Sequence, residues 1–254
     1  MNELLINDKY VSYYVKWHID IQYKMSTERI ELDCLNRPLN SRSAAAGRPI
    51  SLRERDDRAH HARSPSDAMN VSDAIAHRRS VRKFTDRAPT RAELERMVHA
   101  ATLAPNHRLT QPWRFYVLGP EARAAYGLAL GNRKAKKATD EAQADSIRQT
   151  TSREHRAQPC MLVVSVVLNE NPEFREEDYA ATMMAVQNLS LSAVEQGLGT
   201  HIRTGAIMDD PAARAAALVP DSERIVAVLT VGVPLEHSEA KARRAASELT
   251  HWVA

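Results

Sequence analysis

A helix that is apolar on nearly all sides constrains the fold of this 254-residue chain more than any other feature. We predict the helix over residues 173–196, ended by Gly197 in the left-handed conformation. Between residues 179 and 194, apolar side chains point in almost every direction: Ala180, Met183, Met184, Val186, Leu189, Leu191 and Val194. Such a helix has to be covered on every side. One small domain rarely provides that cover, so we expect a subunit interface as the second cover.

Two continuous apolar runs predict strands that are covered on both faces. They occupy residues 161–168 and 225–233. Shorter strands are predicted over residues 114–118 and 199–203. The pattern indicates a sheet of about four strands with helices on its faces, which is an α/β sandwich of the α+β or α/β class.

Capping residues predict where the remaining helices begin. Ser72 is the expected cap of a short helix that ends near Arg78, and Thr90 with Glu93 forms a capping box. Gly119-Pro120 leads into a helix to about residue 130, and Asp210 caps another helix. Residues 133–157 are charged and rich in alanine, and we expect an exposed helix or a mobile excursion there.

The composition of residues 1–68 differs from that of the rest. Residues 1–30 hold four of the seven tyrosines, lack alanine and alternate like a strand from residue 11 to 21. Residues 41–68 are mostly polar and are expected to be disordered. We therefore expect an N-terminal extension over residues 1–68, disordered or non-native, and a domain over residues 69–254 that begins at Met69.

Bulk composition argues against several protein classes. Net charge is only +3, with 35 Lys+Arg against 32 Asp+Glu, whereas dedicated nucleic-acid binders show a stronger and segregated excess. The two cysteines, Cys34 and Cys160, are far apart and indicate a reducing compartment. The N-terminus lacks the pattern of a secretory signal. A cytoplasmic protein is expected.

A basic cluster is the first candidate site. Arg78, Arg79, Ser80 and Arg82 lie within five positions, directly after a predicted helix. Guanidinium groups match phosphate in a bidentate manner and suit a partly buried phosphate. The alternative is a solvated helix end whose positive charge favours the helix dipole. On its own the cluster favours that alternative, because most charge runs lie on the surface.

Two other segments offer polar groups at strand ends. The loop at residues 104–113 carries His107 and a Gln-Pro-Trp sequence, and Arg203-Thr204-Gly205 follows a predicted strand. Each is also compatible with an ordinary surface loop or turn. The chain shows no phosphate-binding loop, nucleophile elbow or zinc-ligand spacing, and Gly197-Leu198-Gly199 lacks the context of a dinucleotide fingerprint. We expect no metal site; His60-His61 is a weak candidate.

Four segments together resemble the nitroreductase family of FMN-dependent NAD(P)H oxidoreductases, most of all its short, single-domain NAD(P)H nitroreductase branch. They are residues 78–84 (Arg-Arg-Ser-Val-Arg-Lys-Phe), 104–115 (Ala-Pro to Gln-Pro-Trp-Arg-Phe), 195–199 (Glu-Gln-Gly-Leu-Gly) and 231–234 (Val-Gly-Val-Pro). Their order and spacing agree with the family over about residues 70–234. The resemblance implies a nitroreductase-like α+β fold. It consists of a central mixed or antiparallel sheet flanked by helices, with the long apolar helix at a homodimer interface that holds two FMN molecules.

The resemblance also implies which residues bind cofactors. Arg78, Arg79 and Ser80 would hold the phosphate and ribityl chain of FMN, and Arg82 would lie near the flavin pyrimidine edge and stabilise the reduced flavin. Leu103 and His107 would reach the partner subunit's flavin. Ile202, Arg203 and Thr204 would complete the phosphate side. The stretch assigned to the nicotinamide nucleotide is Ser192, Ala193, Val194, Glu195, Gln196 and Gly197.

The implied activity is hydride transfer from NAD(P)H to the flavin and then to a nitroaromatic, quinone or similar acceptor, in ping-pong order. The flavin carries the chemistry, so no catalytic side chain is expected. Leu109 departs from the asparagine that many members have, which leaves the acceptor range open. Flavin fragmentation, dehalogenation or enone reduction on the same scaffold are alternatives. A basic nucleic-acid-binding module is a rival from another class, although the few aromatics do not interleave with the arginines.

Overall fold

The computed structural model describes residues 69–236 and 239–253. The strand expected near residues 11–21 and the disorder expected over residues 41–68 lie outside the described residues, as do His60 and His61. Within the described residues, no helix is both long and apolar enough to cross a membrane.

The centre of the described chain is a four-stranded antiparallel sheet in the order β1-β2-β4-β3. Its strands are β1 (Trp113–Leu118), β2 (Met161–Val167), β3 (Gly199–Arg203) and β4 (Glu223–Gly232). Strands β2 and β4 are central and almost entirely buried, as their uninterrupted apolar runs predict. The short strand β3 forms one edge of the sheet. Its outer side is open to the segment that follows α2 (Val71–His77), the first helix described.

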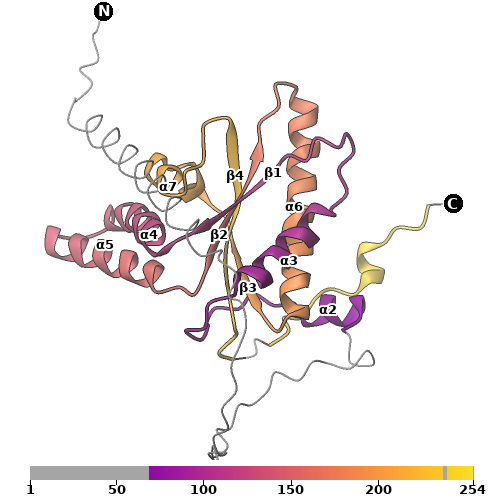
Figure 1. The fold of residues 1–254 in the computed structure, drawn as a ribbon, viewed down its shortest axis with the longest axis horizontal. Coiled ribbons are helices and arrows are strands. Elements are labelled where there is room, and N and C mark those ends of the chain that lie inside the picture. Colours follow the sequence, from indigo (N-terminus) through magenta and orange to yellow (C-terminus); the bar gives the residue numbers. More distant parts are fainter. Residues whose placement is uncertain (1–68, 237–238, 254) are drawn as a thin grey trace, which may run out of the picture. The chain divides into compact units, whose positions relative to one another are not determined.

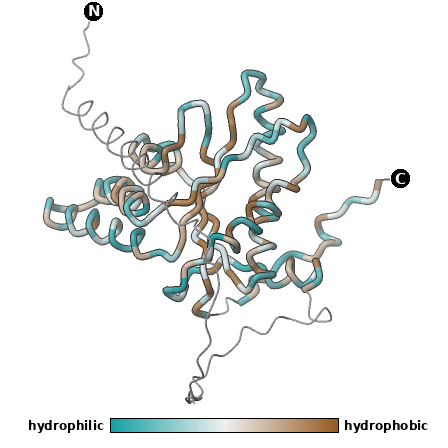
Figure 2. Tube along the Cα trace, in the orientation of Figure 1, coloured by the Kyte–Doolittle hydropathy of each residue, from teal (hydrophilic) through white to brown (hydrophobic). Residues whose placement is uncertain are grey.

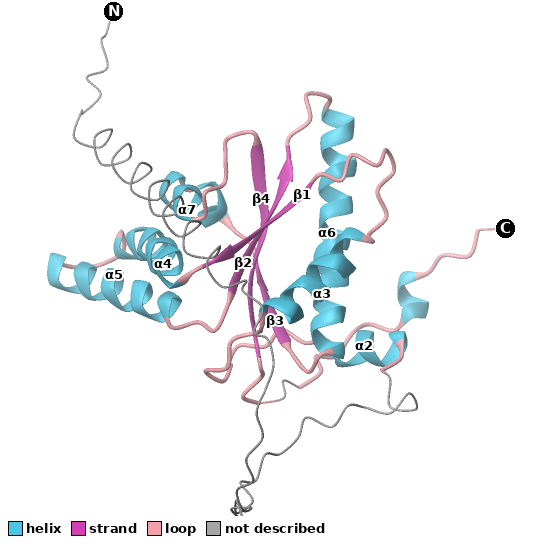
Figure 3. Cartoon of the chain, in the orientation of Figure 1, coloured by secondary structure: helices cyan, strands magenta, loops and turns pink. Residues whose placement is uncertain are grey.

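Helices cover both faces of the sheet (Figure 1). Helices α3 (Arg91–Thr102) and α6 (Pro172–Glu195) lie on one face. Helices α4 (Pro120–Ala135) and α7 (Pro211–Ala216) lie on the other face, with α5 (Glu141–Arg156) packed on α4. The short α2 (Val71–His77) lies beside α6, and two 3-10 turns are formed by η3 (Ala206–Asp209) and η4 (Ala246–Leu249) (Figure 3). The predicted α+β sandwich is confirmed.

Two apolar clusters fill the layers on either side of the sheet, and the brown colour in Figure 2 gathers along the central strands. The cluster under α6 includes Leu162, Val164 and Leu229, and the cluster under α4 and α7 includes Met161, Val163 and Val228. The side-chain alternation of β2 therefore divides its continuous apolar run between two cores.

Helix α6 is buried on one side only within this chain. The side that faces the sheet carries small and branched residues such as Ala185, Val186 and Leu189, which are at most 1% exposed. The opposite side leaves Tyr179 36% exposed and Met184 42% exposed. The expectation that this helix needs a second cover thus stays a prediction, because nothing in the described chain covers Met184.

Local signals in the sequence located most helix ends. The Thr90–Glu93 capping box is present, Asp210 caps α7, and Gly197 follows α6 at φ 71°. The prediction for Ser72 was wrong: the cap of α2 is Asn70, whose side chain accepts from the backbone N–H of Asp73. Either residue type can cap a helix, so composition did not separate two neighbouring candidates.

The helical region after Gly119 is longer and more buried than predicted. Helix α4 extends to Ala135, five residues beyond the expected end, and α5 packs on α4 instead of forming an excursion. The close packing depends on Gly127 and Gly131, where an added Cβ would lie 2.7 Å from the Cβ of His155 and 2.8 Å from the Cα of Arg148. Glycine lets two helices approach closely, which a pattern of charged residues does not reveal.

Candidate functional site: a cationic groove beside strand β3

The predicted basic cluster lines a large groove, with a volume of about 1140 Å³. Arg78, Arg79, Ser80 and Arg82 form one wall, and β3 contributes His201. Residues after β4 complete it: Glu236, Glu239, Ala240, Lys241 and Arg243. The structure therefore brings together the four predicted residues of the first motif.

Backbone pairing fixes the basic cluster against β3. Ser80 forms a parallel bridge with Thr200, and the backbone N–H of Val81 donates to the Thr200 carbonyl at 3.0 Å. Farther along, Thr85 donates to Val233 and Leu235 donates to Lys83. The segment after α2 thus runs along the open edge of β3, so its side chains are held by the sheet rather than by a free loop.

The arginines differ in how much of their hydrogen-bonding capacity the protein uses. Arg79 donates to the carbonyl oxygens of Ala76 and Arg78, which is the helix-end role that the alternative interpretation expects. Among the described residues, no ion pair joins Arg78, Arg79 or Arg82 to a carboxylate, although Lys83 pairs with Glu236 at 3.2 Å. Arg78 and Arg82 therefore bring positive charge to the groove with donors available for an anion.

His201, Lys241 and Arg243 were missed by the sequence analysis. Burial lowers the pKa of His201, and the positive charges of Arg203 and Arg82 lower it further. The imidazole is therefore neutral at neutral pH and offers the groove a hydrogen bond without adding charge. Alternation along β3 predicts that His201 and Arg203 share one side of the strand. The basic run at residues 241–244 was a visible signal for the other two.

Arg203 does not line the cationic groove. Its Nη2 donates to Gln158 Oε1 at 3.1 Å and to Thr230 Oγ1 at 2.8 Å, and it lines a small cavity below α4 together with Thr204. Ile202 lies on the other side of β3 and packs against the core under α6. None of these three predicted residues lines the cationic groove, and their contact with FMN stays a prediction.

The loop between α3 and β1 is held in a defined conformation beside α6 (Figure 3). Asn106 Oδ1 accepts from the backbone N–H of Gln111 at 2.7 Å, and Leu109 and Gln111 have φ values of 50° and 46°. Thr110 donates to the buried Asp178 of α6 at 2.5 Å. Positive φ is unusual for such residues, so the side-chain bonds hold a strained loop in place.

The same loop presents side chains to the outside. Arg108 stacks on Phe174 with 3.8 Å between its Cζ and the ring centre, and it pairs with Glu177 at 3.2 Å. His107 is exposed, and Leu103 at the end of α3 is 68% exposed. Neither lines the cationic groove, and their predicted contact with a partner subunit's flavin stays a prediction.

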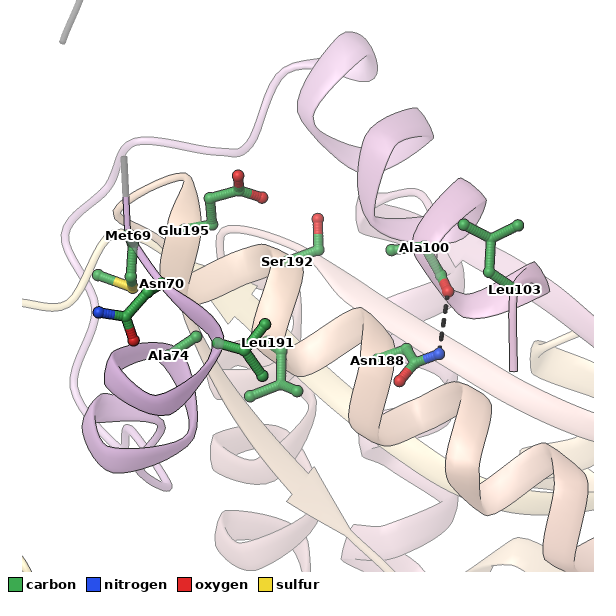
Figure 4. A pocket seen from close by; sticks show the side chains of 10 residues that line it. Met69, Asn70, Ala74, Ala100, Leu103, Asn188, Leu191, Ser192 and Glu195 are labelled. Carbon is green, nitrogen blue, oxygen red and sulfur yellow. Dashed lines mark hydrogen bonds between the residues drawn. The ribbon is translucent and has the colours of Figure 1, made fainter. Parts of the chain in front are cut away.

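Residues 192–197, which are predicted to bind the nicotinamide nucleotide, form the C-terminal end of α6 and the turn after it. Ala193 is fully buried in the core, while Gln196 accepts from Arg96 and donates to Ser192 and the Glu93 carbonyl. Ser192 and Glu195 line a groove of about 330 Å³ between α2, α3 and α6, where Asn188 donates to the Ala100 carbonyl (Figure 4). Val194 is half-buried and Gly197 is exposed.

Comparisons with known proteins bear on the family of this chain. The model of the nitroreductase family matches residues 75–233. The Bacillus subtilis protein named "Putative NAD(P)H nitroreductase YfhC" is 35% identical over 176 residues, which cover 68% of this chain and 89% of that protein. A similarly named Escherichia coli K12 protein, YdjA, is 29% identical over 65% of this chain and 89% of its own length.

Solved structures show the same fold. A nitroreductase-like family protein of Bacillus cereus has a TM-score of 0.64 and 31% identity, covering 73% of this chain and 96% of that one. A Desulfovibrio desulfuricans structure described as a nitroreductase in complex with FMN has a TM-score of 0.54 and 25% identity, covering 71% of this chain and 95% of that one. This chain belongs to the nitroreductase family.

Proposed function

We propose that this chain is an FMN-dependent oxidoreductase that uses NAD(P)H to reduce a small acceptor such as a nitroaromatic or a quinone. The observation that carries the proposal is the cationic groove, in which Arg78 and Arg82 face open space without a carboxylate partner among the described residues. Family membership supports it, and so does the FMN in the Desulfovibrio desulfuricans relative.

The groove fits the chemistry of a flavin nucleotide. A phosphate with about two negative charges matches guanidinium donors, and the volume suffices for a cofactor of this size. We assign the phosphate and ribityl chain to Arg78, Arg79 and Ser80, with Lys241 and Arg243 as further cations on the same groove. Arg82 and the neutral His201 are the groups available to the flavin ring, and the backbone of Ile202 to Thr204 meets it at the strand end.

The bound flavin would supply the redox chemistry, carrying hydride between NAD(P)H and the acceptor in two half-reactions and so giving ping-pong kinetics. The chain's own part is to bind and orient. Arg82 contributes a fixed positive charge where negative charge develops on reduction. Ser192, Glu195 and Gln196 are the polar members of the predicted nicotinamide stretch, and none of them is fully buried, so we assign contact with the nucleotide to them.

A homodimer is part of the proposal. The outer side of α6 leaves Met184 42% exposed, and nearby α2 and α3 leave Val71 72% and Leu103 68% exposed. Exposed apolar residues gathered on neighbouring helices are typical of a subunit interface. A second copy placed there would bring Leu103 and His107 to the partner's flavin. We also propose a cytoplasmic location.

Absorbance of the purified full-length protein tests the proposal. A flavin spectrum, or uptake of added FMN by the colourless protein, is the expected result. Stopped-flow mixing with NADH and NADPH then measures reduction, and a screen of nitroaromatics, quinones and enones identifies the acceptor class. A protein that neither contains nor takes up FMN contradicts the proposal. Binding of nucleic acid without flavin would support the rival class instead.

A further inference from the structure

A small, partly open cavity lies behind β3, on the side of the sheet away from α6. Its volume is about 30 Å³, and five structural elements meet around it. Helices α4 and α5 contribute Tyr126, Leu130 and His155, the end of β3 contributes Arg203 and Thr204, and η3 and β4 contribute Ile207, Met208 and Val228. The cavity is separate from the cationic groove, since the two share no lining residue.

Two buried polar atoms at this cavity have no hydrogen-bond partner among the described residues. They are Tyr126 Oη and His155 Nε2, on side chains whose residues are 2% and 5% exposed. The two rings are neighbours, with centroids 6.3 Å apart, yet no direct hydrogen bond joins them. Buried polar groups in native proteins nearly always have a partner, so two unpartnered groups on residues that line one cavity point to a small polar molecule that bridges them.

The protonation states of the two groups define what that molecule has to offer. His155 Nδ1 lies 2.8 Å from the Thr151 carbonyl oxygen, which can only accept, so Nδ1 carries the hydrogen. Burial lowers the pKa of His155, and the positive charges of Arg203 and Lys134 lower it further, against the effects of the Thr151 hydrogen bond and Glu154. At neutral pH, Nε2 therefore presents a lone pair.

Tyr126 presents the complementary group. Burial raises the pKa of its phenol to about 12, so the hydroxyl is protonated and able to donate at neutral pH. Arg203 at the cavity wall donates to Gln158 and Thr230 and has further N–H groups. A molecule that bridges the two groups must therefore donate a hydrogen bond to His155 Nε2 and accept one from Tyr126 Oη.

We propose that this cavity is a built hydration site, in which one or two ordered waters bridge Tyr126 Oη and His155 Nε2 beside Arg203. Water both donates and accepts, and a cavity of this volume holds one or two molecules, since each requires about 10–15 Å³. A halide or another small anion is disfavoured because it cannot donate a hydrogen bond to the lone pair of His155 Nε2. The bridge would join α4 and α5 to the end of β3, whose edge carries the cationic groove.

A high-resolution crystal structure of the full chain tests the occupant directly. The expected density peak lies about 2.7–3.2 Å from both Tyr126 Oη and His155 Nε2. Soaking in bromide and measuring anomalous scattering separates water from an anion. An anomalous bromide peak in the cavity, or a cavity without density, would overturn the proposal.

The direction in which Tyr126→Phe shifts the melting temperature gives an independent test. If water bridges the two groups, removing the hydroxyl takes away one of its partners and lowers the melting temperature by a few degrees. If the cavity is dry, the same change removes an unsatisfied buried hydroxyl and raises the melting temperature, which contradicts the proposal.

The tautomer of His155 supplies a third measurement that does not depend on flavin binding. In ¹⁵N NMR of the folded protein, Nδ1 should give the shift of a protonated nitrogen and Nε2 that of an unprotonated, hydrogen-bonded nitrogen. A protonated Nε2 at neutral pH would contradict the proposed donor–acceptor arrangement.

Discussion

Val81 and Gly199 lie so close together that a side chain at position 199 has no room. An added Cβ at Gly199 would lie 2.5 Å from Val81 Cγ2 and 3.0 Å from the ring of Pro234. This contact accompanies the hydrogen bond from Val81 to Thr200 that carries the basic cluster along the edge of β3. The position of Arg78 to Arg82 thus depends on a glycine more than 100 residues away in the sequence.

The first prediction concerns this contact. Gly199→Ala forces Val81 away from the strand, so we expect a loss of about 1–3 kcal/mol in the free energy of unfolding and weaker FMN binding. Chemical denaturation and FMN titration measure the two effects. Gly119→Ala is the control, because nothing lies within 4 Å of a Cβ there. Equal effects of the two substitutions would show that the Val81 contact is unimportant.

The second prediction is that Arg78 contributes to FMN binding and little to the stability of the fold. Arg78→Ala removes a guanidinium from the cationic groove, so we expect FMN affinity to fall about 10- to 100-fold, in line with about 1.5–3 kcal/mol for a hydrogen bond to a charged group. The melting temperature should change little. The control is Arg133→Ala, which removes the same charge at an exposed position near the end of α4. Unchanged FMN affinity in Arg78→Ala would place the phosphate elsewhere.

The third prediction is that Arg203→Ala lowers the stability of the protein and changes FMN affinity little. The guanidinium hydrogen bonds to Gln158 and Thr230 are lost, and the small cavity behind β3 becomes larger. We expect a loss of about 1–3 kcal/mol in the free energy of unfolding, measured by denaturation in the presence and absence of FMN. A drop in FMN affinity without any loss of stability would restore the direct phosphate role predicted from the sequence.

The contrast between these two arginines shows what the sequence can reveal. Arginine in a short motif indicated a phosphate at both positions, and only the three-dimensional structure separates them. Arg78 follows a helix and faces open space, whereas Arg203 lies on the side of β3 that faces α4. The side of β3 on which Arg203 lies could not be assigned until the limits of the strand were known.

The fold was more accessible to sequence reasoning than the site. Apolar runs, the Thr90 capping box and Gly197 gave the strands and most helix ends because each reflects a local physical requirement. The contribution of Lys241, Arg243 and His201 to the groove depends on residues distant in the sequence meeting at one strand edge. No local pattern encodes that meeting.

The fourth prediction concerns acid stability. Burial and neighbouring positive charges lower the pKa of His155 and His201 in the folded state. The unfolded state, with a histidine pKa of about 6.5, then binds more protons, so the free energy of unfolding should fall as the pH drops below about 6.5. Above that pH, these two groups should contribute no slope. Thermal melts between pH 8 and pH 5 measure the dependence.

A variant of His155 assigns that slope. His155→Phe removes one of the two groups and should flatten the loss of stability toward pH 5 relative to the unchanged protein. If the His155→Phe protein keeps the original pH dependence, His155 is not responsible for it.

The fifth prediction tests the outer side of α6 as a subunit interface. Met184→Glu places a charge in the middle of the exposed apolar side, and a buried unpaired charge is costly, so we expect the proposed dimer to dissociate at micromolar concentration. Sedimentation equilibrium measures the mass. FMN should be lost together with the dimer, because Leu103 and His107 then no longer reach the partner's site. Gln149→Glu adds the same charge on the exposed part of α5 and should leave both mass and flavin content unchanged. A Met184→Glu protein that remains dimeric and retains flavin would place the interface on another surface.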